Sequence, residues 1–298
     1  MKILTYLSVP ILAVYLGLFF YSYDDSFKKE EFVPLPKLEE KETSKVVKTD
    51  EFLENYIIGV VSCEMPASYN IEALKAQAIA ARTFAYYKIN QENYKESNLT
   101  TSKDQCYIDD ASMQKKWGSG YEKYKNIVTS AVKATEGIVL KKDNKLFKTY
   151  YFSTSNGYTE DAIAVFNNGD ITSVSSPWDT STPDYKKTIT YKKDELVSKL
   201  GNFNNIEIVS RSKTNHVEKV RVDDKEYTGI NFRKLLGLRS TDFTIDINSE
   251  DLIITTYGYG HGVGMSQSGA NELAKQNKDY KYILSYYYNT DEFANIYV

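Results

Sequence analysis

The chain has 298 residues, enough for one large or two modest domains with a substantial buried core. Its 37 basic and 40 acidic residues are interspersed and give a net charge of -3, so the sequence lacks a strong positive field. Nucleic acid is therefore not expected as the main partner. The 26 tyrosines supply many flat amphipathic rings, which suit a protein core as well as the faces of sugars.

The N-terminal segment differs in composition from the rest of the chain. An uncharged run of 21 residues, from Ile3 to Tyr23, matches the ~30 Å hydrocarbon thickness of a bilayer when it is helical. The apolar stretch of a cleavable signal peptide would be only ~7 to 15 residues long and would end at small residues, whereas Tyr23 is followed by two aspartates. Residues 1–23 are therefore predicted to be an uncleaved membrane anchor, with Lys2 on the inside and the bulk of the chain outside. Residues 24–49 are rich in charge and contain two prolines, which predicts a flexible tether.

Three helices are predicted at the start of the globular part, residues 50–298. Asp50 is a suitable N-cap for a short amphipathic helix that ends near Glu64, and Pro66 prevents its continuation. Apolar residues recur every three or four positions from Ile71 to Ile89, which predicts a second helix. A third is expected over about 121–136, and a polar, tyrosine-containing loop is expected between the second and the third.

After residue 137 the pattern changes to short β-rich runs. Residues 138–141 and 146–154 are predicted to form a hairpin around the turn residues Asp143 and Asn144. Further strands and short helices follow, so the fold class is predicted to be α+β, with a smaller inserted module over about 185–250. The strands are expected at 188–191, 205–210, 216–222, 243–248 and 251–256, and the helices near 194–200 and 230–237.

Glu64 is the first candidate catalytic residue. It stands in SCEMP, at the break between two apolar helices, where a carboxyl group is partly removed from water. Burial raises the pKa of a carboxyl, as a general acid near neutral pH requires. Cys63 and Cys106 are the only cysteines, and outside the cytoplasm a disulfide between them is one option that their spacing does not decide.

Charged and polar residues elsewhere form the rest of the candidate site. Arg82 falls on or beside the apolar stripe of the second helix and Lys75 lies seven residues earlier, so both are expected on roughly one side of that helix. A hydroxyl-rich loop, STSNGYTE at 153–160, follows an aromatic strand and suits either a saccharide rim or an ordinary turn. The motif YGYGHGVGMSQSGA at 257–270 places four glycines around His261, which lets backbone approach a ligand closely.

These motifs, together with NFRKLLGLRS at 231–240, resemble the stage II sporulation protein D family in the family's order, over nearly everything from residue 50 onward. The resemblance implies a lytic transglycosylase, which cuts between N-acetylmuramic acid and N-acetylglucosamine in peptidoglycan and leaves a 1,6-anhydro end. Glu64 matches the family's catalytic Glu. The resemblance also implies a role in engulfment during sporulation and a complex with stage II sporulation proteins M and P.

By matching position, further residues are expected to line the cleft. Lys75, Gln77 and Arg82 are candidates for the region beside Glu64, and a second group is expected to form the sugar-binding wall: Ser153, Ser155, Tyr158, His261 and Ser266. Some family members carry a His-Cys pair suited to zinc where Ser112 and Met113 stand here, so no metal and no cofactor is assigned.

Three other interpretations of the motifs remain open. Glu160 and Asp161 could supply the second carboxylate of a hydrolytic glycosidase, whereas a transglycosylase needs only one because the sugar's own 6-hydroxyl is the nucleophile. A wall-binding or scaffold module without activity is the main alternative in another class. A metal-dependent amidase or peptidase would need His261 together with other metal ligands.

Overall fold

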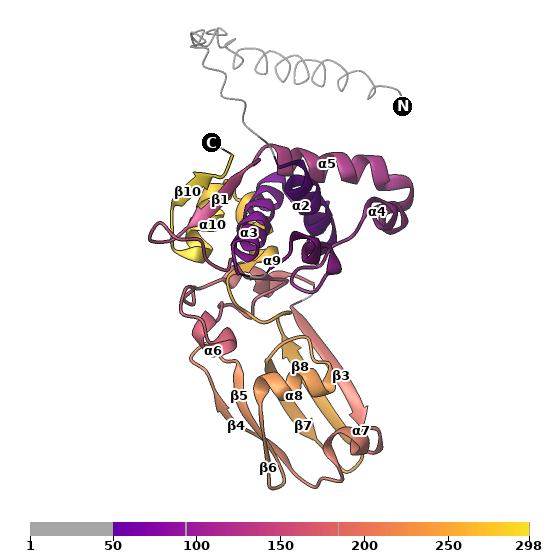
Figure 1. Cartoon of the computed structure of the whole chain (residues 1–298). Coiled ribbons are helices and arrows are strands. Elements are labelled where there is room, and N and C mark those ends of the chain that lie inside the picture. Colours follow the sequence, from indigo (N-terminus) through magenta and orange to yellow (C-terminus); the bar gives the residue numbers. More distant parts are fainter. Residues whose placement is uncertain (1–49, 93, 184, 298) are drawn as a thin grey trace, which may run out of the picture. The chain divides into compact units, whose positions relative to one another are not determined.

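The computed structural model describes residues 50–92, 94–183 and 185–297 (Figure 1). The predicted membrane anchor at 1–23 and tether at 24–49 lie outside these residues. Within the described part, no helix combines the length and the apolar character that crossing a bilayer requires.

Two of the predicted helices have nearly the expected bounds. Helix α2 covers Glu51–Glu64, and the carboxylate of its N-cap, Asp50, accepts a hydrogen bond from the Leu53 amide at 3.1 Å. Helix α3 covers Ile71–Ile89. The third, α5, covers Tyr121–Lys133 and so ends a few residues earlier than expected.

The polar segment between α3 and α5 is not the loop that the sequence predicts. It contains helix α4, Asp110–Trp117, and two short 3-10 helices, η1 at Glu96–Thr101 and η2 at Gly118–Gly120. Helix α4 has one buried residue, Met113, and begins after the N-cap Asp109, whose carboxylate accepts a hydrogen bond from the Ser112 amide at 2.8 Å. A search for apolar periodicity therefore misses it.

The predicted hairpin at 138–154 is wrong. Strand β1, Ile138–Lys141, pairs instead with β10, Glu292–Asn295, in antiparallel orientation. Strand β2, Tyr151–Phe152, pairs in parallel with β9, Met265–Ser266. The turn at 143–144 is present, but both flanking segments find partners from the C-terminal part of the chain, which local sequence cannot indicate.

A module with its own apolar core follows, and its strands agree with the predicted ones within a few residues. One antiparallel sheet has the order β3-β8-β7 and the other β4-β5-β6, of which β6 was not predicted. Two helices pack with them. The elements are β3 Lys186–Lys192, α7 Lys193–Leu200, β4 Ile206–Arg211, β5 Val217–Val222, β6 Lys225–Thr228, α8 Gly229–Leu236, β7 Asp242–Ile247 and β8 Asp251–Tyr257.

Four further elements complete the described chain: α6 Ala162–Phe166, η3 Pro177–Ser181, α9 Gln267–Lys275 and α10 Tyr280–Tyr288. Helix α3 runs through the helical part of the molecule and contacts α2, α5, α9, α10 and β1 (Figure 1). Its many alanines are fully buried and let these neighbours approach closely. The described residues thus combine a helical core with sheets, and the α+β prediction is confirmed for them.

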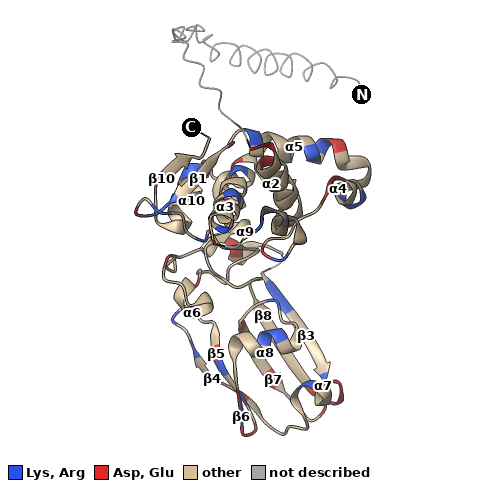
Figure 2. Ribbon diagram, in the orientation of Figure 1, with Lys and Arg blue, Asp and Glu red and all other residues tan. Residues whose placement is uncertain are grey.

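Figure 2 shows Lys and Arg interspersed with Asp and Glu along the described elements. This distribution agrees with the near-neutral net charge of the sequence.

Candidate functional site

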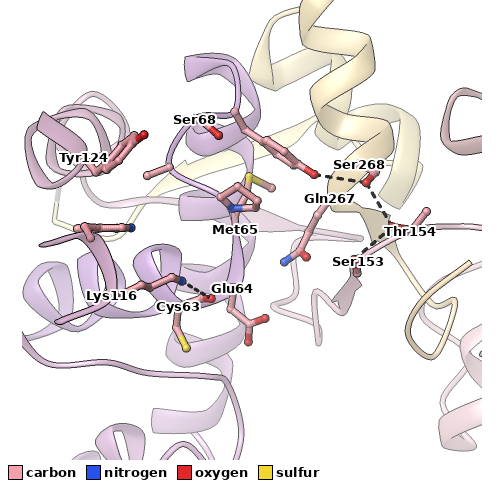
Figure 3. A pocket seen from close by; sticks show the side chains of 14 residues that line it. Cys63, Glu64, Met65, Ser68, Lys116, Tyr124, Ser153, Thr154, Gln267 and Ser268 are labelled. Carbon is pink, nitrogen blue, oxygen red and sulfur yellow. Dashed lines mark hydrogen bonds between the residues drawn. The ribbon is translucent and has the colours of Figure 1, made fainter. Parts of the chain in front are cut away.

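Glu64 is the last residue of α2. The next residue, Met65, has an extended backbone with φ -123° and ψ 140°, and Pro66 follows it. Because the helix stops here, the Glu64 side chain extends from the C-terminal end of α2 and borders the pocket shown in Figure 3.

A disulfide fixes one of these loops against the end of α2. Cys63 is bonded to Cys106, and the Cys106 amide donates a hydrogen bond to Oε1 of Glu64 at 2.8 Å. The loop reaches this position because residue 59 on α2 is glycine. A Cβ atom there would lie 2.4 Å from the ring of Tyr107. The cysteine pair therefore holds a backbone donor on the candidate catalytic carboxyl group.

The environment of Glu64 suits a proton donor. Burial raises the pKa of its carboxyl group, while the Cys106 amide, the Gln267 side chain and the charge of Lys116 lower it. Burial is the largest effect, so the net direction is upward. The same donors are in place to stabilise the carboxylate after it has given up its proton.

Glu64 lines a first pocket of about 480 Å³ (Figure 3). Lys116 borders it and donates hydrogen bonds to the carbonyl oxygens of Ser62 and Cys63 at 2.7 and 3.2 Å, so this side chain caps the end of α2. The opposite wall comes from residues distant in sequence, Ser153 and Thr154 and the start of α9. The lining residues are Cys63, Glu64, Met65, Pro66, Ala67, Ser68, Tyr69, Lys116, Trp117, Tyr124, Ser153, Thr154, Gln267 and Ser268.

Glu64 also lines a second pocket, of about 350 Å³. This one is largely aromatic, and His261 lies in it with its ring 5.0 Å from that of Phe166. Burial lowers the pKa of His261 to about 4, so its imidazole is neutral near pH 7. The other lining residues are Phe84, Asp104, Gln105, Thr149, Tyr150, Tyr151 and Phe166. Glu64 thus lines both pockets.

The glycine-rich motif contributes to both pockets, His261 to the second and Gln267 and Ser268 to the first. Gly264 has φ +79°, and a Cβ atom on it would lie 2.0 Å from the Tyr150 carbonyl oxygen. Only glycine allows this approach, which brings β9 beside β2.

Several expected site residues lie behind the pocket walls. Gln77 is buried and accepts a hydrogen bond from Gln267 at 3.3 Å, so it supports a lining residue. Ser155 and Ser266 both donate to the buried carboxylate of Asp179, at 2.6 and 2.8 Å. Of the expected sugar-binding wall, Ser153 lines the first pocket and His261 the second.

Other expected residues lie away from Glu64. Arg82 is fully buried and forms two hydrogen bonds with the carboxylate of Glu54, of 2.7 and 2.6 Å, rather than facing the cleft. The physical reason is that α3 is buried on several sides, so a residue beside its apolar stripe still faces another helix. Lys75 forms an ion pair with Glu72 at 2.6 Å and lines neither pocket. Tyr158 borders a different hollow, described below.

The two carboxyl groups considered for a hydrolytic mechanism also lie elsewhere. Glu160 is buried, with Oε1 3.7 Å from Nε2 of His216, and Asp161 forms an ion pair with Lys213 at 2.9 Å. Neither lines a pocket with Glu64. Among the described lining residues, the other carboxyl group that shares a pocket with Glu64 is that of Asp104, which forms a 3.0 Å ion pair with Lys88.

The sequence analysis did not assign three residues that line the first pocket or support its walls. Lys116 stands in an exposed-looking stretch of α4 and has no motif of its own, so only the packing of α4 on α5 places it near Glu64. Gln267 lies in the glycine-rich motif that was recognised. Asp179 gives no sequence signal beyond a polar segment, yet it organises three serines, the third being Ser176 at 2.8 Å. Among the described residues, no group of three or more His, Cys, Asp or Glu is placed to hold a metal ion.

Comparisons with known proteins find similarity to stage II sporulation proteins and to an amidase enhancer. A family model described as "Stage II sporulation protein" matches residues 40–141. Stage II sporulation protein D of Bacillus subtilis is 39% identical over 264 residues, 83% of this chain and 77% of that protein. Its counterpart from Bacillus amyloliquefaciens is 40% identical over 248 residues, 79% and 72% of the two chains. The amidase enhancer of Bacillus subtilis is 29% identical over 292 residues, 77% of this chain and 39% of that protein.

Proposed function

Because this chain belongs to the stage II sporulation protein D family, we propose that it cleaves peptidoglycan glycan strands as a lytic transglycosylase, with Glu64 as its acid/base catalyst. One observation carries the proposal. Glu64, whose partly buried carboxyl group has a raised pKa, lines two pockets, so a saccharide chain that occupies both pockets would present the linkage between two sugars to it.

The proposed reaction needs no water. The Glu64 carboxyl group donates its proton to the glycosidic oxygen, and the bond from that oxygen to C1 of N-acetylmuramic acid breaks with development of positive charge at C1. The Glu64 carboxylate, held by the Cys106 amide, then takes the proton of the 6-hydroxyl group as its oxygen bonds to C1. The products are a 1,6-anhydro end and a free 4-hydroxyl group, and Glu64 regains its proton.

A hydrolytic reaction is the second candidate, because Asp104 shares the second pocket with Glu64. Its ion pair with Lys88 and the hydrogen bond that it accepts from Tyr94 at 2.8 Å favour its ionised form, which a second carboxylate would need. These same contacts also engage both of its oxygens, which supports a structural role and the one-carboxyl mechanism.

The test is mass spectrometry of the products that the full-length protein, purified in a mild detergent, releases from peptide-free glycan. Anhydro ends are expected. Reducing ends that disappear in Asp104→Asn would mean hydrolysis instead. Glu64→Gln is expected to abolish cleavage and keep the fold, since its amide oxygen can still accept the Cys106 hydrogen bond.

Absence of products from a protein that binds glycan would favour the wall-binding or scaffold alternative. The name of one relative, amidase enhancer, suits a protein that supports another enzyme. Release of peptides from intact peptidoglycan that stops on chelation would favour the metal-dependent amidase or peptidase.

We further propose that residues 1–23 anchor the protein in the membrane with the catalytic part outside the cytoplasm, where it acts during engulfment with stage II sporulation proteins M and P. The Cys63–Cys106 disulfide supports the location, because disulfides persist in oxidising compartments and are rare in the cytosol. Digestion of intact protoplasts with an external protease tests it. The part from residue 50 onward should be degraded while cytoplasmic markers survive.

A further inference from the structure

A third hollow, of about 330 Å³, lies apart from Glu64, where the loop after β2 meets the module of β3 to β8. Three tyrosines border it, Tyr158 from the loop, Tyr185 just before β3 and Tyr257 at the end of β8. We refer to it as the tyrosine pocket. Nothing in the proposed reaction uses it.

The tyrosines present ring surface to solvent. Tyr158 is 52% exposed, so about half of this side chain is open to solvent beside the hollow that it lines. The rings of Tyr185 and Tyr257 are partly exposed and lie 5.8 Å apart with a tilt of 57°. Tilted rings with hydroxyl groups at their edges offer both apolar faces and hydrogen-bonding tips. This combination matches sugar rings, which have C–H faces and hydroxyl edges.

A buried carboxylate holds the walls of the tyrosine pocket in place. Asp242, at the start of β7, is 3% exposed and accepts hydrogen bonds from Asn156 at 2.8 Å and from Asn215 at 3.1 Å. Arg211 lies 3.4 Å from the same carboxylate and balances its charge. The loop, the β4–β5 connection and β7 are therefore joined before any ligand arrives, which lowers the ordering cost of binding.

The charges around the tyrosine pocket do not favour a metal cation as its ligand. The negative charge of Asp242 is already compensated by Arg211, and the ammonium group of Lys213, which also lines the pocket, forms an ion pair with Asp161. A mostly uncharged, hydroxyl-rich ligand suits this balance better than an ion of either sign.

One short segment connects the tyrosine pocket with the cleft at Glu64. Ser153 and Thr154 line the first pocket, and Asn156 and Tyr158 line the tyrosine pocket. Five residues of chain span at most roughly 17 Å even when fully extended, so the Cα atoms of Ser153 and Tyr158 are no farther apart than that. A single oligosaccharide can bridge such a distance.

We propose that the tyrosine pocket is a second saccharide-binding site, which holds the glycan strand at a distance from the bond being cut. This inference rests on the proposed function for the identity of the polymer. A strand that occupies both sites gains affinity because binding at the second is intramolecular once the first is filled. Long strands are therefore bound better than fragments that fill only the cleft at Glu64.

The test is binding of a hexamer of N-acetylglucosamine to the full-length protein, measured by titration calorimetry in the Glu64→Gln background so that no cleavage occurs. Tyr158→Ala is expected to weaken binding roughly 3- to 10-fold, the factor that corresponds to loss of one aromatic contact. Tyr158→Phe should restore most of it. Tyr282→Ala, which removes another exposed tyrosine that lines none of the three pockets, is the matched control and should bind as the parent does.

Equal binding by Tyr158→Ala and Tyr282→Ala would overturn the proposal. Because Tyr158 is exposed, its truncation should leave the fold intact, and circular dichroism checks this. With Glu64 present, Tyr158→Ala should raise KM for long peptide-free strands by a similar factor and leave kcat nearly unchanged. A protein that cuts no glycan but loses hexamer binding in Tyr158→Ala would disprove the proposed reaction and retain this site.

Discussion

Replacing Arg82 with alanine is expected to destabilise the protein strongly without altering its chemistry. Arg82 is fully buried between α3 and its neighbours, and its guanidinium group also donates to the carbonyl oxygen of Ile138 at 3.1 Å. Its partner Glu54 accepts further hydrogen bonds from the Gly137 amide at 3.2 Å and the Tyr297 hydroxyl at 3.0 Å. The pair therefore joins α2, α3, β1 and the C-terminal segment.

The magnitude follows from what the substitution leaves behind. Removing one member of a buried ion pair costs about 3–5 kcal/mol, because the remaining charge stays away from water without its partner. Here Arg82→Ala strands the Glu54 carboxylate with two weaker donors. At roughly 2–4 °C per kcal/mol for a domain of this size, the melting temperature should fall by about 6–20 °C.

Thermal unfolding of the full-length protein, followed by far-UV circular dichroism, measures the change. Arg221→Ala is the matched control, since that arginine forms ion pairs at an exposed site and should change the melting temperature little. Replacing both partners with apolar residues, Arg82→Met with Glu54→Leu, should destabilise less than Arg82→Ala alone.

A melting temperature within about 2 °C of the parent would refute the reasoning. A variant that stays folded but cuts glycan far more slowly would instead place Arg82 in the cleft.

Three further outcomes follow from the titrating groups and the disulfide. Cleavage should fall as pH rises through the raised pKa of Glu64, because this residue must start the reaction protonated. Lys116→Met removes a nearby cation and should move this falling limb of the pH–rate profile to higher pH. A limb that does not move would contradict the assigned effect of Lys116 on the pKa of Glu64. Reduction of the Cys63–Cys106 disulfide should slow cleavage at unchanged secondary structure, because it frees the loop that carries the amide donor to Glu64. The same reductant should have no effect on the variant in which both cysteines are replaced with serine. Burial raises the pKa of Glu160 from 4.5 to about 7, so the folded state holds this proton more tightly than the unfolded state does, and the free energy of unfolding should decline as pH rises between these values. Glu160→Gln should flatten that decline, as measured by denaturant titrations at several pH values. An unchanged dependence of the free energy of unfolding on pH would argue against the burial of Glu160.

The sequence by itself determined the local structure around Glu64. The N-cap at Asp50, the apolar spacing of α2 and α3 and the proline after Met65 are short-range signals, and each depends on residues within one or two turns. The strands of the module from β3 to β8, except β6, could likewise be located from alternation and turns. The motifs also identified the family, since SCEMP and the glycine-rich segment occur in a recognisable order.

Only the tertiary structure decided which distant residues meet. The segments after residue 137 have strand character, but their partners lie more than 100 residues later, where pairing depends on the whole fold. The sequence motifs made Arg82 and Ser153 equal candidates for the cleft. Arg82 is buried against Glu54, whereas Ser153 lines the first pocket. The direction of a side chain on a helix is fixed by local geometry, whereas what it faces is fixed by the packing of other elements, and this is why Lys116 could not be assigned from sequence.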